Sequence, residues 1–239
     1  VCYERYIRYP TDVKLLWECC VWVYKQQLFP LRKALKVRLG KEKERFDTQR
    51  KKYLGYAKLK RKAYKKTRKR IKSLLNLLSR GVDALQALLD TGQLVGQLNE
   101  RFYQYLRTIK HILQQQYYLY QHPGSKVKDR IVSLHKPYVR PIKRGKENKP
   151  TEFGPKVHMM QVDGLSFIEH LNFNAFNECK RLKISVFKHK IIFGECRQVS
   201  ADKIYATNEN RRFCTQQGIF TNFVPKGPLL KDHSWAKAQ

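Results

Sequence analysis

Apolar side chains recur with a helical period through the first half of the chain. Residues 12–29 place them three or four positions apart, which predicts a helix that ends at Pro30 because proline cannot continue a helix. Residues 31–80 are rich in helix formers, and residues 82–120 carry Leu, Phe and Ile on one stripe. With a turn at Gly81, the last two segments predict a long antiparallel helical pair.

After residue 125 the pattern changes to short runs separated by turns. Residues 130–142 are strand-like, although prolines interrupt them. Two apolar runs flank an Asp-Gly pair within residues 151–173, and this is a strong signal for a β-hairpin. A helical segment that ends at Gly194 follows, and after it come a strand, a short helix with Thr207 at its N-cap and a last strand. The second half therefore predicts α/β structure.

The chain is strongly basic, since 50 Lys and Arg against 19 Asp and Glu give a formal net charge of +31. Such a charge repels itself and favours a polyanionic partner. Nucleic acid fits best, because neutralised phosphates release counterions; a merely solvated basic surface is the alternative. Tyr53, Tyr56 and Tyr64 lie among the charges, where they either stack on bases or, as we expect, pack on a partner helix.

Neither the first residues nor the cysteines indicate secretion. The opening VCYERYIRYP lacks the apolar core of a signal peptide, and the run LLWECCVWV is far shorter than the roughly 20 residues of a membrane span. The 6 cysteines form no Cys-x-x-Cys pair and no zinc-finger spacing, which is typical of reduced thiols. We therefore expect a cytoplasmic protein without a membrane partner.

One carboxylate stands out at the end of an apolar strand. Asp202 follows the short run CRQVSA and precedes a helix. In an open α/β sheet, ligands collect beyond the carboxyl ends of the strands, and a carboxylate there can hold a divalent metal ion. Asp202 is therefore our candidate metal ligand, and the alternative is that it only caps the helix after it.

Several blocks of the chain resemble the DDE transposases of bacterial insertion sequences, which have a ribonuclease-H-like catalytic core. The blocks cover most of residues 1–28 and 130–228. They are RYPTDVKLLWE (8–18), RPIKRGKENKPTEFGPKVHM (140–159), VDGLSFIEHL (162–171), FNE (176–178), ADKIYATNENRRFC (201–214) and GIFTNFVPKGP (218–228). The middle of the chain matches by layout, as a helical insertion after the start of the core.

The resemblance implies a mechanism. Three acids hold two Mg²⁺ or Mn²⁺ ions, and a water frees a 3′-hydroxyl at the element boundary that then attacks target DNA. The partners it implies are double-stranded DNA, as inverted repeats and as target, and a second copy of the chain on DNA. It places the protein in the bacterial cytoplasm, at the nucleoid.

Of the three acids, Asp202 alone carries over, as the middle one. The first Asp would precede Val1 and the final Glu would follow Gln239. The resemblance therefore implies an internal fragment that is inactive by itself.

The fold class expected from pattern and resemblance together is α/β, with part of a ribonuclease-H-like mixed sheet and a long all-helical insertion built as a helical hairpin. The expected divisions are the start of the catalytic core at 1–29, the basic helical insertion at 30–125, the α/β core with Asp202 at 126–228 and a polar tail at 229–239.

Basic residues near the candidate site are expected to hold DNA phosphates, which position DNA without reading its sequence. Most of them belong to one loop. They are Arg140, Lys143, Arg144, Lys146, Lys149, Lys156, Lys203 and Arg211. The expected function is DNA transposition, and the alternatives are a non-catalytic basic nucleic-acid-binding protein and a divergent nuclease.

Overall fold

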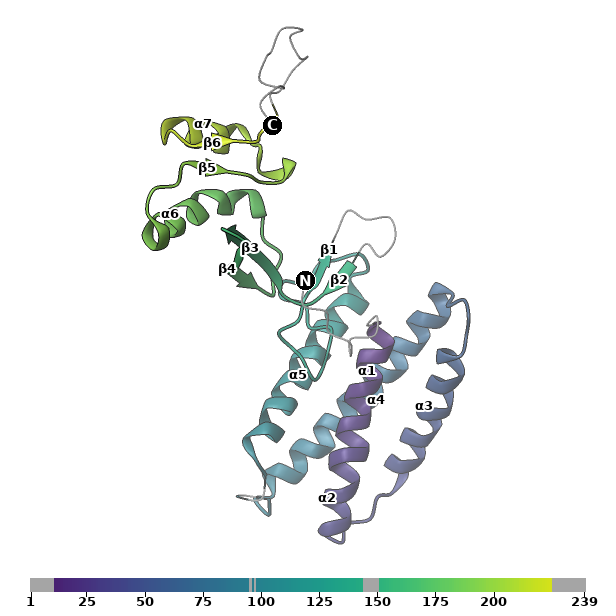
Figure 1. Cartoon of the computed structure of the whole chain (residues 1–239). Coiled ribbons are helices and arrows are strands. Elements are labelled where there is room, and N and C mark those ends of the chain that lie inside the picture. Colours follow the sequence, from purple (N-terminus) through teal and green to yellow (C-terminus); the bar gives the residue numbers. More distant parts are fainter. Residues whose placement is uncertain (1–10, 95, 97, 144–150, 225–239) are drawn as a thin grey trace. The chain divides into compact units, whose positions relative to one another are not determined.

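The computed structural model describes residues 11–94, 96, 98–143 and 151–224 (Figure 1). The chain divides into a helical unit, Cys2–Gly154, and a C-terminal unit that starts at Pro155. Two of the boundaries expected from the sequence, after residues 29 and 125, fall inside the helical unit. Asp202 belongs to the C-terminal unit.

The described helices of the helical unit form four rods. The first is continuous through an α-helix, a π-helix and a second α-helix, and α4 lies against the other three rods (Figure 1). The elements are α1 (Asp12–Cys20), η1 (Val21–Leu28), α2 (Phe29–Ala34), α3 (Lys41–Ala57), α4 (Tyr64–Asp90) and α5 (Glu100–Gln121). The helical insertion expected at 30–125 is therefore three long helices, not a pair.

The core of this unit is leucine-rich and lies where α4 meets the first rod and α5. Leu16, Leu28, Leu78 and Ile109 are fully buried, and each such side chain stabilises the fold by roughly 2 kcal/mol. Aromatic rings extend this core to α3, where Trp17 stacks on the ring of Tyr53 with centroids 4.7 Å apart. The expectation that Tyr53 packs on a partner helix is confirmed.

Pro30 does not end the first helix, so that prediction is wrong. The helix widens to π geometry before the proline, and the backbone N–H of Phe29 donates to the carbonyl of Tyr24, five residues back. Pro30 then lies in the first turn of α2, directly after the π-helix. Because proline has no N–H, one carbonyl of the preceding turn loses its helical donor there.

Gly81 does not mark a turn, because α4 runs through it from Tyr64 to Asp90. The reason is close packing. A Cβ atom at Gly81 would lie 2.5 Å from Cε2 of Tyr24 and 2.9 Å from Cγ1 of Val23. The chain turns after Asp90 instead, where Gly92 and Gly96 take positive φ angles of 73° and 77°.

Residues 130–140 are not a strand, and the backbone of Ile131 near their start is bound by a side chain of α5. Gln115 accepts a hydrogen bond from the N–H of Ile131 at 2.7 Å and donates one to its carbonyl at 3.0 Å. Pairing begins only at β1 (Pro141–Lys143), which is antiparallel to β2 (Thr151–Phe153).

The C-terminal unit opens with the hairpin that Asp-Gly predicts. Strands β3 (Lys156–Val162) and β4 (Leu165–Asn172) pair antiparallel. Asp163 and Gly164 turn between them with φ angles of 49° and 80°, which is the positive-φ pair that a tight two-residue hairpin turn needs.

The rest of this unit contains a small β-α-β arrangement. Two-residue strands β5 and β6 pair in parallel, and α7 connects them. Thr207 caps α7, and Gly194 with a φ of 84° ends α6, as predicted. The elements are η2 (Glu178–Arg181), α6 (Leu182–Phe193), β5 (Gln198–Val199), η3 (Lys203–Tyr205), α7 (Asn208–Gln216) and β6 (Phe220–Thr221).

The fold is mixed but mostly helical, and no ribonuclease-H-like sheet is evident among the described residues. Their strands form three separate two-stranded sheets. The expected mixed sheet fails because a central strand needs a continuous apolar run buried on both faces, whereas β5 and β6 are two residues long and exposed or half-buried. No helix within the described ranges is long and apolar enough to span a membrane.

Candidate metal and nucleic-acid site

Asp202 lies three residues beyond the carboxyl end of β5. Its exposed side chain starts η3, and Oδ1 accepts a hydrogen bond from the backbone N–H of Lys203 at 3.0 Å. Asp202 therefore caps the three-residue turn η3, whereas Thr207 caps α7. The cap uses one oxygen only, because Oδ2 has no hydrogen-bond partner among the described residues. The turn is fixed from the other side by the N–H of Ala201, which donates to Asn222 at 3.0 Å.

A cavity of about 770 Å³ opens beside Asp202 within the C-terminal unit. Strand β3, the Asp163 turn, α6 and the segment before Asp202 line it, and Tyr205 closes one side. Burial and the nearby carboxylate of Glu178 raise the pKa of Tyr205 to about 12, so its hydroxyl stays protonated. Three carboxylates line the cavity, those of Asp163, Glu195 and Asp202, and the Tyr205 hydroxyl is hydrogen-bonded to Glu178.

These residues do not make a complete two-metal site. Within the described ranges no group of three His, Cys, Asp or Glu side chains gathers closely enough to hold a metal ion. A two-ion centre needs several acids that bridge the ions, and Asp202 brings one unpaired oxygen. The described residues therefore do not complete a two-ion site, and we derive no metal-dependent step from them.

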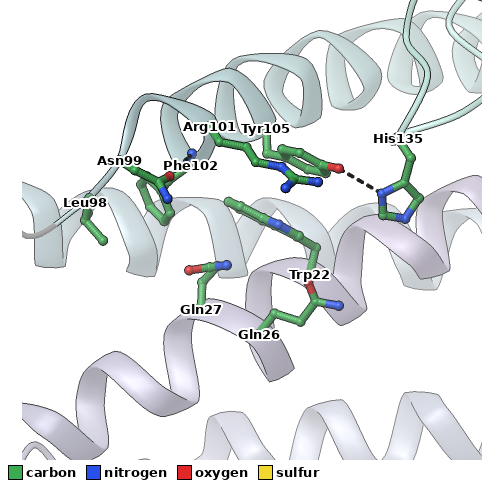
Figure 2. A pocket seen from close by; sticks show the side chains of 9 residues that line it. All are labelled: Trp22, Gln26, Gln27, Leu98, Asn99, Arg101, Phe102, Tyr105 and His135. Carbon is green, nitrogen blue, oxygen red and sulfur yellow. Dashed lines mark hydrogen bonds between the residues drawn. The ribbon is translucent and has the colours of Figure 1, made fainter.

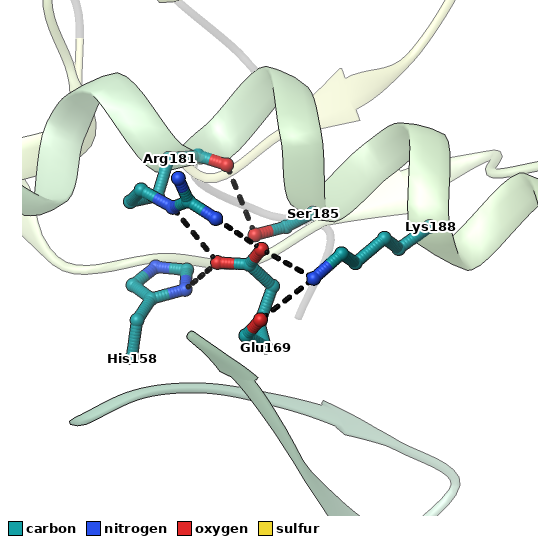
Figure 3. A network of polar contacts seen from close by, with 5 residues as sticks. All are labelled: His158, Glu169, Arg181, Ser185 and Lys188. Atoms are coloured by element: carbon teal, nitrogen blue, oxygen red, sulfur yellow. Dashed lines mark hydrogen bonds and ion pairs between the residues drawn. The ribbon is translucent and has the colours of Figure 1, made fainter. Parts of the chain in front are cut away.

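A buried carboxylate that sequence analysis missed holds α6 to the hairpin (Figure 3). The Glu169 side chain is fully buried, and Arg181 donates to its two oxygens at 3.0 and 2.6 Å. Lys188 approaches Oε1 at 3.0 Å, and Nδ1 of His158 lies 3.0 Å from Oε2. The signal was present, since Glu169 shares a strand face with Phe167 and a carboxylate on such a face needs cations.

The charges around Glu169 keep it ionised. Burial acts to raise the pKa of Glu169, but the hydrogen bonds from Arg181 and Lys188 outweigh it and lower the pKa to about 2. Burial lowers the pKa of His158 more than Glu169 raises it, so the imidazole is neutral at pH 7. The buried carboxylate of Glu169 is compensated by Arg181 and Lys188, and the role of this network is structural.

The loop residues expected to bind phosphate are only partly described. Arg140 donates to the carbonyls of Pro137 and Val139, so its guanidinium serves its own loop. Lys143 is exposed on β1. Arg144, Lys146 and Lys149 lie outside the described residues.

The other three belong to the C-terminal unit, where two of them are engaged within the fold. Lys156 pairs with Glu178 at 2.8 Å. Arg211 donates to the carbonyls of Phe223 and Val224. Lys203 is exposed beside Asp202, so among the described candidates Lys143 and Lys203 present the most accessible charges.

A second cavity, of about 390 Å³, lies in the helical unit beside the π-helix (Figure 2). Trp22 and Tyr105 stack along it with centroids 5.6 Å apart, and the Tyr105 hydroxyl bonds Nδ1 of His135 at 2.9 Å. Gln26 and Gln27 add amide groups. Among the described residues, no acidic side chain lines this cavity.

Comparisons with protein-family models, with curated proteins and with solved structures found no match to this chain. The functional argument therefore rests on the residues and their placement.

Proposed function

We propose that the chain functions in DNA transposition, as part of a DDE-type transposase that cleaves DNA at insertion-sequence ends and transfers the freed strand. The observation that carries the proposal is the position of Asp202, exposed just beyond the carboxyl end of a parallel strand with Oδ2 unpaired. The sequence blocks described above support it, as does the net charge of +31. In this proposal the β5-α7-β6 arrangement belongs to a ribonuclease-H-like core.

The proposal assigns Asp202 as one ligand for Mg²⁺ or Mn²⁺. Oxygen ligands of this kind suit hard divalent ions. The further acids of a two-ion site would have to come from outside the described residues, because within them no ligand group is complete.

The test is DNA cleavage by the longest open reading frame that contains the chain, with Asp202→Asn as the variant. Asn keeps an Oδ1 that can accept the cap from Lys203 and removes the charge, so folding should be preserved. We expect Mg²⁺- or Mn²⁺-dependent nicking and joining of a 3′-hydroxyl end to fall by roughly 1,000-fold or more, while DNA affinity stays unchanged. Asp163→Asn, in the same cavity, is the matched control and should retain activity. Cleavage at the wild-type rate by the Asp202 variant would contradict the assignment.

A second function, non-catalytic binding of nucleic acid, is favoured by a different observation. Within the described residues no group of three possible metal ligands gathers, and two-metal chemistry needs several acids. In that case the wild-type reading frame binds DNA tightly but neither nicks nor joins it with either metal. The same assay therefore separates the two functions.

A further inference from the structure

The end of the α3–α4 hairpin carries an uninterrupted positive charge. Thirteen of the 23 residues from Arg50 to Lys72 are Lys or Arg, and none is Asp or Glu. This segment, which we name the basic tip (residues 50–72), comprises the last turns of α3, the connection and the first turns of α4. It lies wholly within the helical unit.

The charges of the basic tip are not neutralised within the fold. Among the described residues, no carboxylate lies within ion-pair distance of any of them, whereas Arg32, Lys156 and Arg181 elsewhere each have an acidic partner. Most of the basic side chains of the tip are exposed. These exposed residues are Arg50, Lys51, Lys52, Lys58, Lys60, Arg61, Lys62, Lys65, Lys66, Lys69 and Lys72.

Two arginines of the basic tip contact residues outside it and attach the tip to the rest of the helical unit. Arg70 donates to the amide oxygen of Gln49 on α3 at 2.8 Å. The guanidinium of Arg68 lies 4.3 Å from the ring centroid of Tyr120 on α5. The hairpin therefore holds its exposed charges on helices that are fixed to the rest of the unit.

The contacts and exposure of the tyrosines in the basic tip indicate which kind of nucleic acid it suits. Single strands are held by aromatic side chains that stack on bases. Here Tyr53 stacks on Trp17, and the hydroxyl of Tyr56 bonds Thr67 at 2.9 Å. Only Tyr64 is exposed, at 67%. A surface of cations with one free ring suits the phosphate backbone of a duplex better than unpaired bases.

The start of α4 adds to this field. Ala63 gives the helix no side-chain cap, and the first turn contains no acidic residue. The positive end of the helix dipole and the lysines beside it therefore act in the same direction.

We propose that the basic tip is the principal surface through which this chain binds the phosphate backbone of double-stranded DNA. The proposal rests on the DNA partner of the proposed function and gives that partner a place on the molecule. It also assigns the larger part of phosphate binding to the α3–α4 hairpin rather than to the loop near residue 144, whose described neighbour Arg140 is engaged with its own backbone.

The test is a variant in which six exposed Lys or Arg residues of the basic tip are each changed to the uncharged residue Gln. They are Lys51, Lys52, Lys60, Arg61, Lys65 and Lys66. A matched control removes six exposed charges from the same unit outside the tip. They are Lys25, Lys33, Arg38, Lys43, Arg45 and Arg80. Both variants lower the formal net charge of +31 by the same amount.

Affinity for a 30-base-pair DNA duplex is measured by fluorescence anisotropy of the whole chain across a series of salt concentrations. The slope of log K against log salt is about −0.9 per neutralised phosphate, so loss of roughly five contacts should make it shallower by about 4 to 5. We expect the tip variant to lose at least about 100-fold in affinity and the control much less. Circular dichroism of both variants checks that they are folded.

Three results would overturn the proposal: an unchanged slope in the tip variant, an equal loss in the control, or tighter binding of the wild type to single-stranded DNA or duplex RNA of the same length. The proposed function fails separately. If the tip variant loses duplex binding while the wild-type reading frame never cleaves DNA, the tip assignment stands and the transposase assignment falls.

Discussion

Gly81 lies in the middle of α4, where a glycine lowers helix propensity but allows close packing of the backbone. Ala is better than Gly in a helix interior by about 1 kcal/mol, yet here the backbone must approach the ring of Tyr24, whose hydroxyl donates to the carbonyl of Leu77 at 2.9 Å. Close packing of α4 on the π-helix and a buried hydrogen bond thus depend on one missing Cβ. Gly55 has no such packing role, because no atom would lie within 4 Å of a Cβ atom added there.

We therefore predict opposite effects for two Gly→Ala substitutions. Gly81→Ala should lower the free energy of unfolding by about 1 to 2 kcal/mol, because the added methyl group displaces Tyr24 and Val23. Gly55→Ala, in the exposed part of α3, should raise it by about 1 kcal/mol. Urea unfolding followed by tryptophan fluorescence measures both, and equal signs for the two variants would refute the packing argument.

Glu169 gives the C-terminal unit a defined response to acid. Its pKa is lowered in the folded state, so its contribution is complete above the ordinary value of 4.5 and is lost as the pH falls toward about 2. His158 also has a lowered pKa, so protonation opposes folding once the pH falls below 6.5. Both groups destabilise the unit on acidification, in successive pH ranges.

Glu169→Gln should remove the lower of these two steps and keep the upper one. At pH 7 the variant should lose on the order of 2 kcal/mol, because Arg181 and Lys188 lose a charged acceptor but stay partly solvated. Hydrogen exchange of the α6 amides between pH 3 and pH 7 reports the change. A variant whose exchange depends on pH as the wild type does would show that Glu169 has no part in the acid response.

At the scale of elements, local signals in the sequence predicted well and long-range contacts could not be predicted. The Asp163-Gly164 turn, the end of α6 at Gly194 and the Thr207 cap each depend on neighbours within a few residues. The sequence pattern predicts breaks at Pro30 and Gly81, and both predictions are wrong. Pro30 is accommodated after a π-helix, and Gly81 is needed for the close approach of a ring 57 positions away in the chain. Sequence alone does not carry that information.

The segment after α5 provides a test at this scale. Gln115→Ala removes both hydrogen bonds to the backbone of Ile131 and should cost about 2 kcal/mol, because a half-buried N–H and carbonyl lose their partners. The Ile131 amide should exchange faster with solvent by roughly tenfold or more. Gln104→Ala, on an exposed position of α5, should change neither quantity measurably.

At the scale of the whole molecule, the two candidate sites belong to different units. The candidate metal ligand Asp202 lies in the C-terminal unit, and the basic tip lies in the helical unit. The pattern of the sequence correctly placed Asp202 after a strand and before a short helix, since both are local. It does not predict the Glu169 network, because the four members of that network meet only through the fold. It placed phosphate binding near residue 144, whereas the uncompensated charge of the described residues is concentrated in the basic tip.

The uncapped start of α4 has a consequence for the equilibrium between helix and coil. Like charges at Lys65 and Lys69 repel one another along the helix surface, and the lysines oppose the dipole at its positive end. In dilute salt the first turns of α4 should therefore unwind more readily than the leucine-rich turns after them. Any polyanion that binds there neutralises these charges and removes the repulsion. Binding of the polyanion and folding of the first turns of α4 are therefore thermodynamically coupled.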